Sequence, residues 1–239
     1  MNTFRKTCAA VVLAGTAWFG LADGAKAQQY NWTGLYLGGH VGIAATDADW
    51  TFFNGAVTET FRQDSSGWLG GAHLGLQQQM GNFVIGAEVS WSRLNHEDTS
   101  TALLAPNRSR TSEIDDLFLA TVRLGVTFNQ WLPYVKGGYA NGDVSYRTFV
   151  TSSGQPTTQS SGREHGWTVG AGLEYAMTPN LILGVEYDYV RLNVDNRSQY
   201  VFPGFISPET VTNASADIHS VMARLSYKLG DHGEYRPLK

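Results

Sequence analysis

The sequence predicts an all-β fold, an eight-stranded antiparallel up-and-down transmembrane β-barrel with four long extracellular loops. Three observations support this prediction. Eight segments alternate apolar residues with small or polar ones at a period of two, which places one set of side chains on each face of a strand. Short turns alternate with long polar connections, as they do in outer-membrane barrels. Charged residues make up 16% of the 239 residues, whereas soluble domains contain about a quarter.

The first 27 residues are expected to be a cleaved signal peptide. A basic start is followed by an apolar or small run over 8–21 and by an A-x-A cleavage site at 25–27. The run is shorter than the roughly 20 apolar residues of a spanning helix. Cleavage would remove Cys8, the only cysteine. The predicted mature chain therefore has no disulfide or thiol chemistry, and its net charge changes from −4 to −6.

The first four strands are predicted over 34–44, 68–80, 83–93 and 118–128. In each of them the apolar residues share one face: Leu35, Leu37, Val41 and Ile43; Trp68, Ala72, Leu74 and Leu76; Phe83, Ile85, Ala87, Val89 and Trp91; Phe118, Ala120, Val122, Leu124, Val126 and Phe128.

The last four strands are predicted over 133–142, 167–175, 181–189 and 221–229. Their apolar faces carry Pro133, Val135 and Tyr139; Trp167, Val169, Ala171, Leu173 and Tyr175; Leu181, Leu183, Val185, Tyr187 and Tyr189; Val221, Ala223, Leu225, Tyr227 and Leu229. The opposite faces are rich in glycine with scattered charges. Such a face suits the narrow interior of an eight-stranded barrel better than the water-facing side of a lipocalin-like cup or a β-sandwich, which are the soluble alternatives.

The connections indicate which end of the barrel faces outward. Short turns with Gly, Asn and Pro are expected at 81–82, 129–130 and 178–180. Long polar stretches lie near 46–66, 95–113, 147–164 and 193–217 and are assigned to the extracellular side. An even strand number then leaves both termini in the periplasm. In the first long stretch, Asn54-Gly55 predicts a hairpin tip on a ribbon that continues the first two strands.

Aromatic residues near the strand ends match the two interfacial girdles of a membrane barrel. They are Trp68, Trp91, Trp131, Trp167, Tyr189 and Tyr227.

Several motifs then resemble one known family. They are Trp32-Thr33-Gly34-Leu35-Tyr36-Leu37-Gly38-Gly39, Val122-Arg123-Leu124-Gly125, Leu132-Pro133-Tyr134-Val135-Lys136-Gly137-Gly138, Gly184-Val185-Glu186-Tyr187-Asp188-Tyr189 and His219-Ser220-Val221-Met222-Ala223-Arg224-Leu225-Ser226-Tyr227-Lys228. Their order resembles the small opacity-type, porin-like outer-membrane proteins of alphaproteobacteria, a family with immunogenic surface proteins and some haemin-binding members. Proteins of this family usually end on an aromatic residue that the barrel-assembly machinery recognises. Here Leu229 stands in that place, and residues 230–239 form a polar tail.

Motifs for catalysis and cofactors are missing from the sequence. It contains no P-loop and no G-x-G-x-x-G or G-x-S-x-G motif. His96-Glu97 begins like a zincin motif, but Ser100 stands where the second histidine belongs. Asp217 and His219 share a face and are interpreted as part of a surface ion pair. The expectation is no enzyme, no cofactor and no metal, and the absence of a basic footprint argues against nucleic acid.

The inward faces carry eight charged residues, four acidic and four basic: Glu88, Glu174, Glu186 and Asp188, and Arg123, Lys136, Arg224 and Lys228. Buried charges are costly unless they are paired. The sequence therefore predicts one ion-pair network that closes the lumen, with a narrow selective pore as the alternative. His40 and His73 also face inward and are expected to meet at one depth, hydrogen-bonded rather than holding a metal or haem.

The predicted function is structural: a surface-exposed outer-membrane barrel that supports envelope integrity and surface contact. Its expected partners are outer-membrane lipids and lipopolysaccharide, the barrel-assembly machinery, and a host or small-molecule ligand at the loops. The alternatives are a haemin-like ligand-binding protein and a narrow diffusion pore. The first alternative relies on a candidate loop ligand patch of aromatic residues: Trp50, Phe52, Phe53, Phe61, Tyr200, Phe202 and Phe205.

Overall fold

The structure, a computed structural model, describes residues 30–53, 58–95, 98–101, 108–150, 156–194, 200–201 and 210–229. Side chains are described over 30–47, 66–95, 116–143, 162–193 and 216–229. The predicted signal peptide and the polar tail lie outside the described residues.

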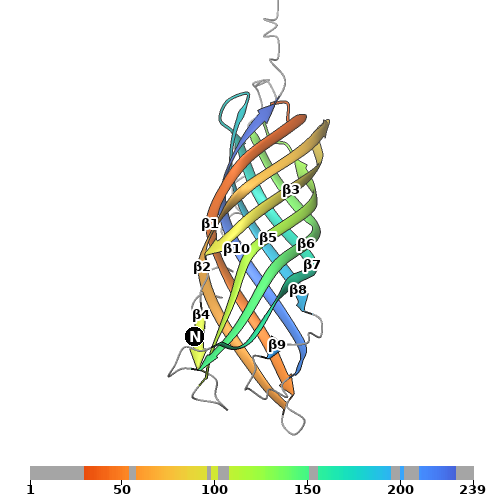
Figure 1. The fold of residues 1–239 in the computed structure, drawn as a ribbon. Helices are drawn as coiled ribbons and strands as arrows, with labels where there is room; N and C mark the ends of the chain where they lie inside the picture. Colours follow the sequence, from red (N-terminus) through yellow and green to blue (C-terminus); the bar gives the residue numbers. More distant parts are fainter. Residues whose placement is uncertain are drawn as a thin grey trace, which may run out of the picture.

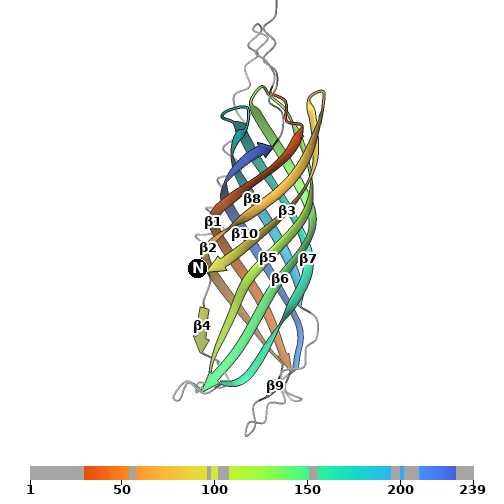
Figure 2. The same ribbon diagram turned by 45° about the horizontal axis from the view of Figure 1, so that its top comes forward.

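Eight long strands close into an antiparallel barrel (Figures 1 and 2). They are β1 (Gly34–Phe53), β2 (Thr58–Met80), β3 (Phe83–Asn95), β5 (Arg108–Val126), β6 (Trp131–Val150), β7 (Pro156–Ala176), β8 (Leu181–Val194) and β10 (Thr210–Leu229). Among these eight strands, neighbours in the chain are neighbours in the sheet, and the pairing of β1 with β10 closes the ring. No helix in these ranges is long and apolar enough to cross a membrane.

The strands extend further toward the long connections than the alternation predicts. β1 continues to Phe53 and β7 already begins at Pro156, so much of the four long polar stretches is hydrogen-bonded strand. Apolar alternation marks only the part of a strand that has one face in lipid. Beyond it both faces can be polar, while the backbone ladder continues unchanged.

The first two strands form the predicted ribbon beyond the apolar band. Their register runs through Trp50 opposite Phe61 to Phe53 opposite Thr58. The predicted tip, Asn54-Gly55, lies outside the described residues. Two short strands add to the same end of the barrel: β4 (Asp98–Thr101), which pairs with β5, and β9 (Tyr200–Val201), which pairs with β7.

Two of the three short turns use a left-handed backbone conformation. Gly81 has φ 62° and Asn129 has φ 56°. Glycine adopts this conformation without a steric penalty, and asparagine tolerates it better than most residues. These turns lie at the upper end of the barrel in Figure 1, where β10 ends.

The outer surface is apolar, as the sequence predicts for a barrel in lipid. Large hydrophobic side chains point outward from every long strand, among them Val122 at 63% exposed and Leu76 at 60%. The six predicted girdle aromatics are also on this face. In water such a continuous apolar band would be unfavourable. Within a bilayer it matches the hydrocarbon core.

The interior is filled in three layers. Near the short turns, Trp32 packs with Val84, Leu132, Ala176 and Ile182. Near the long connections, a second apolar cluster includes these residues: Leu69, Leu94, Leu117, Leu119, Leu192, Ile218 and Met222. Buried polar and charged side chains lie between the two clusters. This polar middle layer is therefore the candidate functional site.

The orientation of the barrel can be tested by labelling. Asn193, at the loop end of β8, and Thr178, in a short turn, are both exposed, and the predicted mature chain has no cysteine. We expect a membrane-impermeant maleimide to label Asn193→Cys on intact cells and to label Thr178→Cys only after lysis. Labelling of Thr178→Cys on intact cells would invert the barrel.

Candidate functional site

Seven of the eight predicted lumen charges form one continuous chain of ion pairs. Arg123 on β5 lies 2.5 Å from Glu174 on β7, measured from Nη2 to Oε2. Its Nη1 lies 3.5 Å from Glu88 Oε2 on β3. Glu88 is also held by Arg224 on β10, at 2.5 Å. None of these four side chains is more than 3% exposed.

The chain of ion pairs continues from Arg224 to the opposite wall. Arg224 binds Glu186 on β8. Lys136 Nζ on β6 lies 2.8 Å from Glu186 Oε1 and 2.9 Å from Asp188 Oδ2. Carboxylates and cations thus alternate along this series of ion pairs: Glu174, Arg123, Glu88, Arg224, Glu186, Lys136 and Asp188. Every cation stands between two carboxylates, which is the arrangement that best offsets the cost of burying charge.

The structure places Lys228, the eighth predicted member, closer to the short turns. Its Nζ donates to the carbonyl oxygen of Asn31 and lies 4.5 Å from the centre of the Tyr30 ring. Lys228 is four residues from Arg224 on the same strand, a separation of about 13 Å along an extended chain. An inward direction alone could not show this difference in depth.

Two buried tyrosines that the sequence analysis did not single out complete the network. Tyr36 Oη donates to Glu88 Oε2 at 2.8 Å and accepts from Arg123 Nη1 at 3.0 Å. Tyr134 Oη donates to Glu186 Oε2. The Arg123 guanidinium lies 4.1 Å from the centre of the Tyr134 ring, within range of a cation–π interaction.

These residues reveal that the barrel consists of two similar halves. Four inward residues recur in the same order: Tyr36, Gly75, Glu88 and Arg123 on β1, β2, β3 and β5, and Tyr134, Gly172, Glu186 and Arg224 on β6, β7, β8 and β10. In each half the tyrosine is opposite the glycine, and the glycine is opposite the glutamate, on successive strands. A shift by four strands out of eight is half a turn, so the halves are related by an approximate twofold rotation about the barrel axis.

The halves differ in what surrounds this shared set. At four equivalent positions the first half has Gly38, His40, His73 and Ser90 where the second has Lys136, Gly138, Gly170 and Asp188. The two strand pairs that join the halves, β5 with β6 and β10 with β1, also differ. Arg123 is opposite Lys136 across β5 and β6, whereas Arg224 is opposite His40 across β10 and β1, two residues beyond the equivalent Gly38.

The two inward histidines meet at one depth, as expected. His40 Nδ1 and His73 Nδ1 are 3.4 Å apart, and the rings are stacked. His40 Nε2 is 2.8 Å from Ser92 Oγ, and His73 Nε2 is 2.7 Å from Ser226 Oγ. Each ring nitrogen therefore has a partner, and which of the two Nδ1 atoms donates depends on the tautomers of the rings.

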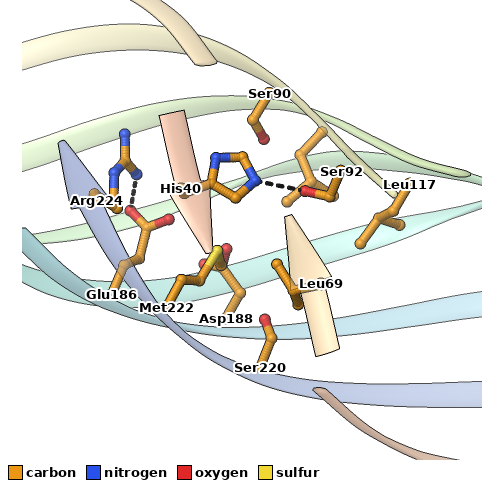
Figure 3. Close-up of a pocket in the computed structure, with 11 residues that line it drawn as sticks. His40, Leu69, Ser90, Ser92, Leu117, Glu186, Asp188, Ser220, Met222 and Arg224 are labelled. Atoms are coloured by element: carbon orange, nitrogen blue, oxygen red, sulfur yellow. Dashed lines mark hydrogen bonds and ion pairs between the residues drawn. The ribbon is translucent and has the colours of Figure 1, made fainter. Parts of the chain in front are cut away.

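A cavity of about 10 Å³ lies between the network and the apolar cluster at the loop end. Figure 3 shows His40, Ser90, Ser220 and Asp188 among the residues around it. Its volume is close to that needed for one water molecule. Within the described residues, no group of three or more His, Cys, Asp or Glu side chains could hold a metal ion.

Residues before β1 cover the opening at the short turns. Trp32 is completely buried there, and its backbone N–H donates to Gln79 Oε1 at 2.9 Å. Tyr30 Oη donates to the carbonyl oxygen of Pro179 at 2.9 Å. Burial, together with the nearby Glu174 carboxylate, raises the pKa of Tyr30 to about 12, so this phenol stays a donor at physiological pH.

The inward glycines leave room for the tyrosine rings. A Cβ added at Gly75 would overlap the Tyr36 ring. We therefore expect Gly75→Ala to lower the free energy of unfolding by about 1–3 kcal/mol through overpacking, as measured by urea unfolding in lipid vesicles. The matched control is Gly39→Ala. Its added Cβ points outward, with its nearest neighbour at 3.5 Å, and a loss equal to that of Gly75→Ala would contradict the packing argument.

The side chains of the candidate loop ligand patch lie outside the described residues. The backbones of Trp50, Phe52 and Phe53 belong to β1, that of Phe61 to β2 and that of Tyr200 to β9. Phe202 and Phe205 are not among the described residues. The patch stays a prediction.

Comparisons with known proteins agree with this architecture. A family model described as an outer membrane protein beta-barrel domain matches residues 11–231. The chain is 27% identical over 215 residues to the 31 kDa outer-membrane immunogenic protein of Brucella melitensis biotype 1, covering 85% of this chain and 86% of that protein. It is 24% identical over 208 residues to the 25 kDa outer-membrane immunogenic protein of Brucella abortus biovar 1, covering 84% and 81%.

Among solved structures, the barrel is similar to the outer membrane protein OprG from Pseudomonas aeruginosa. The TM-score is 0.51 at 12% sequence identity, over 85% of this chain and 99% of that one. This likeness concerns the fold alone. The family match extends over most of the sequence, and the relatives are outer-membrane proteins, which confirms both the predicted family and the predicted location. The chain belongs to the outer membrane protein beta-barrel domain family and is an outer-membrane β-barrel protein.

Proposed function

We propose that this protein is a structural, surface-exposed barrel whose lumen is closed and which catalyses no reaction. The observation that carries the proposal is the buried chain of seven alternating charges between two apolar layers. In a barrel of eight strands the interior is just wide enough for side chains to fill. Ion pairs that cross the lumen therefore act as rigid ties between opposite walls.

Such ties suit a role in envelope integrity better than a role in transport. An ion that entered the lumen would have to separate pairs such as Arg123 with Glu174 and Arg224 with Glu88, each at 2.5 Å. It would then meet Trp32, which is 0% exposed, at the periplasmic end. Breaking one buried pair costs several kcal/mol, and a conducting path would require several such breaks together.

The first test is electrical. Folded protein, verified by its heat-modifiable gel mobility, is placed in planar lipid bilayers at high salt. The expected result is no stepwise current above that of an empty bilayer. Reproducible steps from folded wild-type protein would overturn the closed lumen and support the narrow pore.

A paired cellular test measures the sensitivity of a deletion strain to detergent. We expect increased sensitivity, restored by the wild-type gene, and unchanged sensitivity would contradict the role in envelope integrity.

A further inference from the structure

The twofold repeat makes it possible to compare the outer surfaces of the two halves at equal height. On β6, β7, β8 and β10, close to the loop end of the apolar band, six outward residues form what we call the outer polar patch: Tyr139, His165, Trp167, Tyr189, Arg191 and His219. The four strands are consecutive neighbours in the sheet. Across them, Tyr139 is opposite Trp167, Trp167 is opposite Arg191, and Tyr189 is opposite His219.

The equivalent positions of the first half are largely apolar. They carry, in the same order, Val41, Trp68, Gly70, Trp91, Arg93 and Phe118. The register is the same, since Trp91 is opposite Phe118 as Tyr189 is opposite His219. At the same depth, therefore, the outer surface of the first half is mostly apolar, whereas that of the second half can form hydrogen bonds. An aromatic girdle alone would give the two halves similar outer surfaces at this depth.

The two histidines of the patch are oriented by their neighbours. Asn141 Nδ2 donates to His165 Nδ1 at 3.0 Å. Tyr187 Oη lies 2.7 Å from His219 Nδ1. The Asn141 amide N–H can only donate, so Nδ1 of His165 accepts and the ring carries its proton on Nε2. The hydroxyl of Tyr187 can donate or accept, so its contact orients the His219 ring without fixing the tautomer. His165 then retains an N–H donor in addition to its contact within the barrel, and His219 retains Nε2 as a second hydrogen-bonding atom.

Aromatic faces and a cation complete the patch. The rings of Trp167 and Tyr189 meet edge to face at 5.4 Å, and Tyr189 and His219 are 5.0 Å apart. The Arg191 side chain is 45% exposed, and its Nε is 3.7 Å from Asp217 Oδ1, which also accepts from Tyr189 Oη at 2.9 Å. The Arg191 guanidinium therefore has donors left for an external acceptor.

We propose that the outer polar patch binds the phosphorylated glucosamine headgroup of lipopolysaccharide in the outer leaflet. The patch faces lipid at the edge of the apolar band, which is the depth of the headgroups. Arginine is well suited to phosphate, and the Nε2 atoms of the two histidines can hydrogen-bond to the phosphate or hydroxyl groups of the headgroup. Aromatic side chains with one polar end favour this interfacial zone, and their faces can pack against a sugar ring. The proposal depends on the membrane location of the barrel and not on its closed lumen.

The test compares lipid retention in wild-type and variant barrels. Folded protein is reconstituted in nanodiscs containing lipid A and phosphatidylglycerol, and the lipids that remain bound are counted by native mass spectrometry. One variant, His165→Trp with His219→Phe, gives the two histidine positions the residues of the first half. A second, Arg191→Gln, removes the cation. The matched control is Arg93→Gln, since Arg93 faces Asp116 as Arg191 faces Asp217.

We expect wild-type protein to retain lipid A in preference to phosphatidylglycerol. Each patch variant should weaken this retention about tenfold, the loss of one charge-assisted hydrogen bond or its equivalent. Arg93→Gln should leave retention within about twofold of wild type. Equal retention in wild type and both variants, or an equal loss in Arg93→Gln, would overturn the proposal. Protein dimers that the patch variants abolish while lipid A binding is unchanged would also overturn it, in favour of a second copy as the partner.

Discussion

Replacing Arg123 with alanine is expected to lower the free energy of unfolding by about 3–5 kcal/mol, the usual cost of removing one partner from a buried ion pair. Arg123 donates to both oxygens of Glu174, at 3.1 and 2.5 Å, and packs over the Tyr134 ring. Without it, Glu174 would be left as a buried carboxylate without this partner. Urea unfolding in lipid vesicles, followed by tryptophan fluorescence, measures the change.

Arg93→Ala provides the control for Arg123→Ala, because Arg93 is exposed on the outer surface and its loss should cost about 0–1 kcal/mol. A double-mutant cycle with Glu174→Ala separates the pair from the general effect of each truncation. We expect the double variant to lose less than the sum of the two single variants, since it leaves no unpaired carboxylate at this position. A cost near zero for Arg123→Ala would show that water fills the lumen and that the network is unimportant for stability.

The sequence could predict the strands because the membrane and the lumen impose opposite demands on alternate residues. In β3, Phe83, Ile85 and Val89 point to lipid while Glu88 and Ser90 point inward, and the period of two is plain. The same rule could not locate the outer ends of the strands. β7 begins at Pro156, in a stretch without apolar alternation, because backbone pairing continues where no face is buried in lipid.

The members of the lumen network could be predicted better than their partners. A charge on a glycine-rich inward face was sufficient to identify Arg123 and Glu174. Their pairing joins β5 to β7 across the lumen, whereas the neighbour of Arg123 in the sheet is Lys136. Such contacts depend on the stagger of the whole barrel, and this stagger follows from all eight registers together. The depth of Lys228 is a different case, because its four-residue separation from Arg224 on one strand can be read from the sequence.

A signal for the buried tyrosines was nevertheless present. Tyr134 and Glu186 each stand 98 positions after Tyr36 and Glu88. This spacing identifies the repeat once the strands are known. Tyrosine is common on both faces of membrane barrels, so without the repeat nothing marks these two as members of the network.

Replacing Trp32 with alanine is the second change for which we expect a large effect. Trp32 is 0% exposed and packs with Val84, Leu132, Ala176 and Ile182 at the periplasmic end of the lumen. Truncation of a buried tryptophan removes this packing and leaves a cavity, at a cost of about 3–5 kcal/mol. The same urea unfolding experiment measures it.

Two further variants show whether the Trp32 effect comes from this layer. Trp32→Phe should lose clearly less than Trp32→Ala, because a phenyl ring fills part of the space of the indole and the indole N–H, which has no hydrogen-bond partner in its buried position, is removed. Trp131→Ala removes a tryptophan from the outer surface near the same end, where the side chain is 47% exposed, and it should also cost less. If Trp32→Ala unfolded at the same urea concentration as wild type, the segment before β1 would add nothing to the closure of the barrel. The ion-pair chain would then have to account for the stability of the lumen without an apolar layer beneath it.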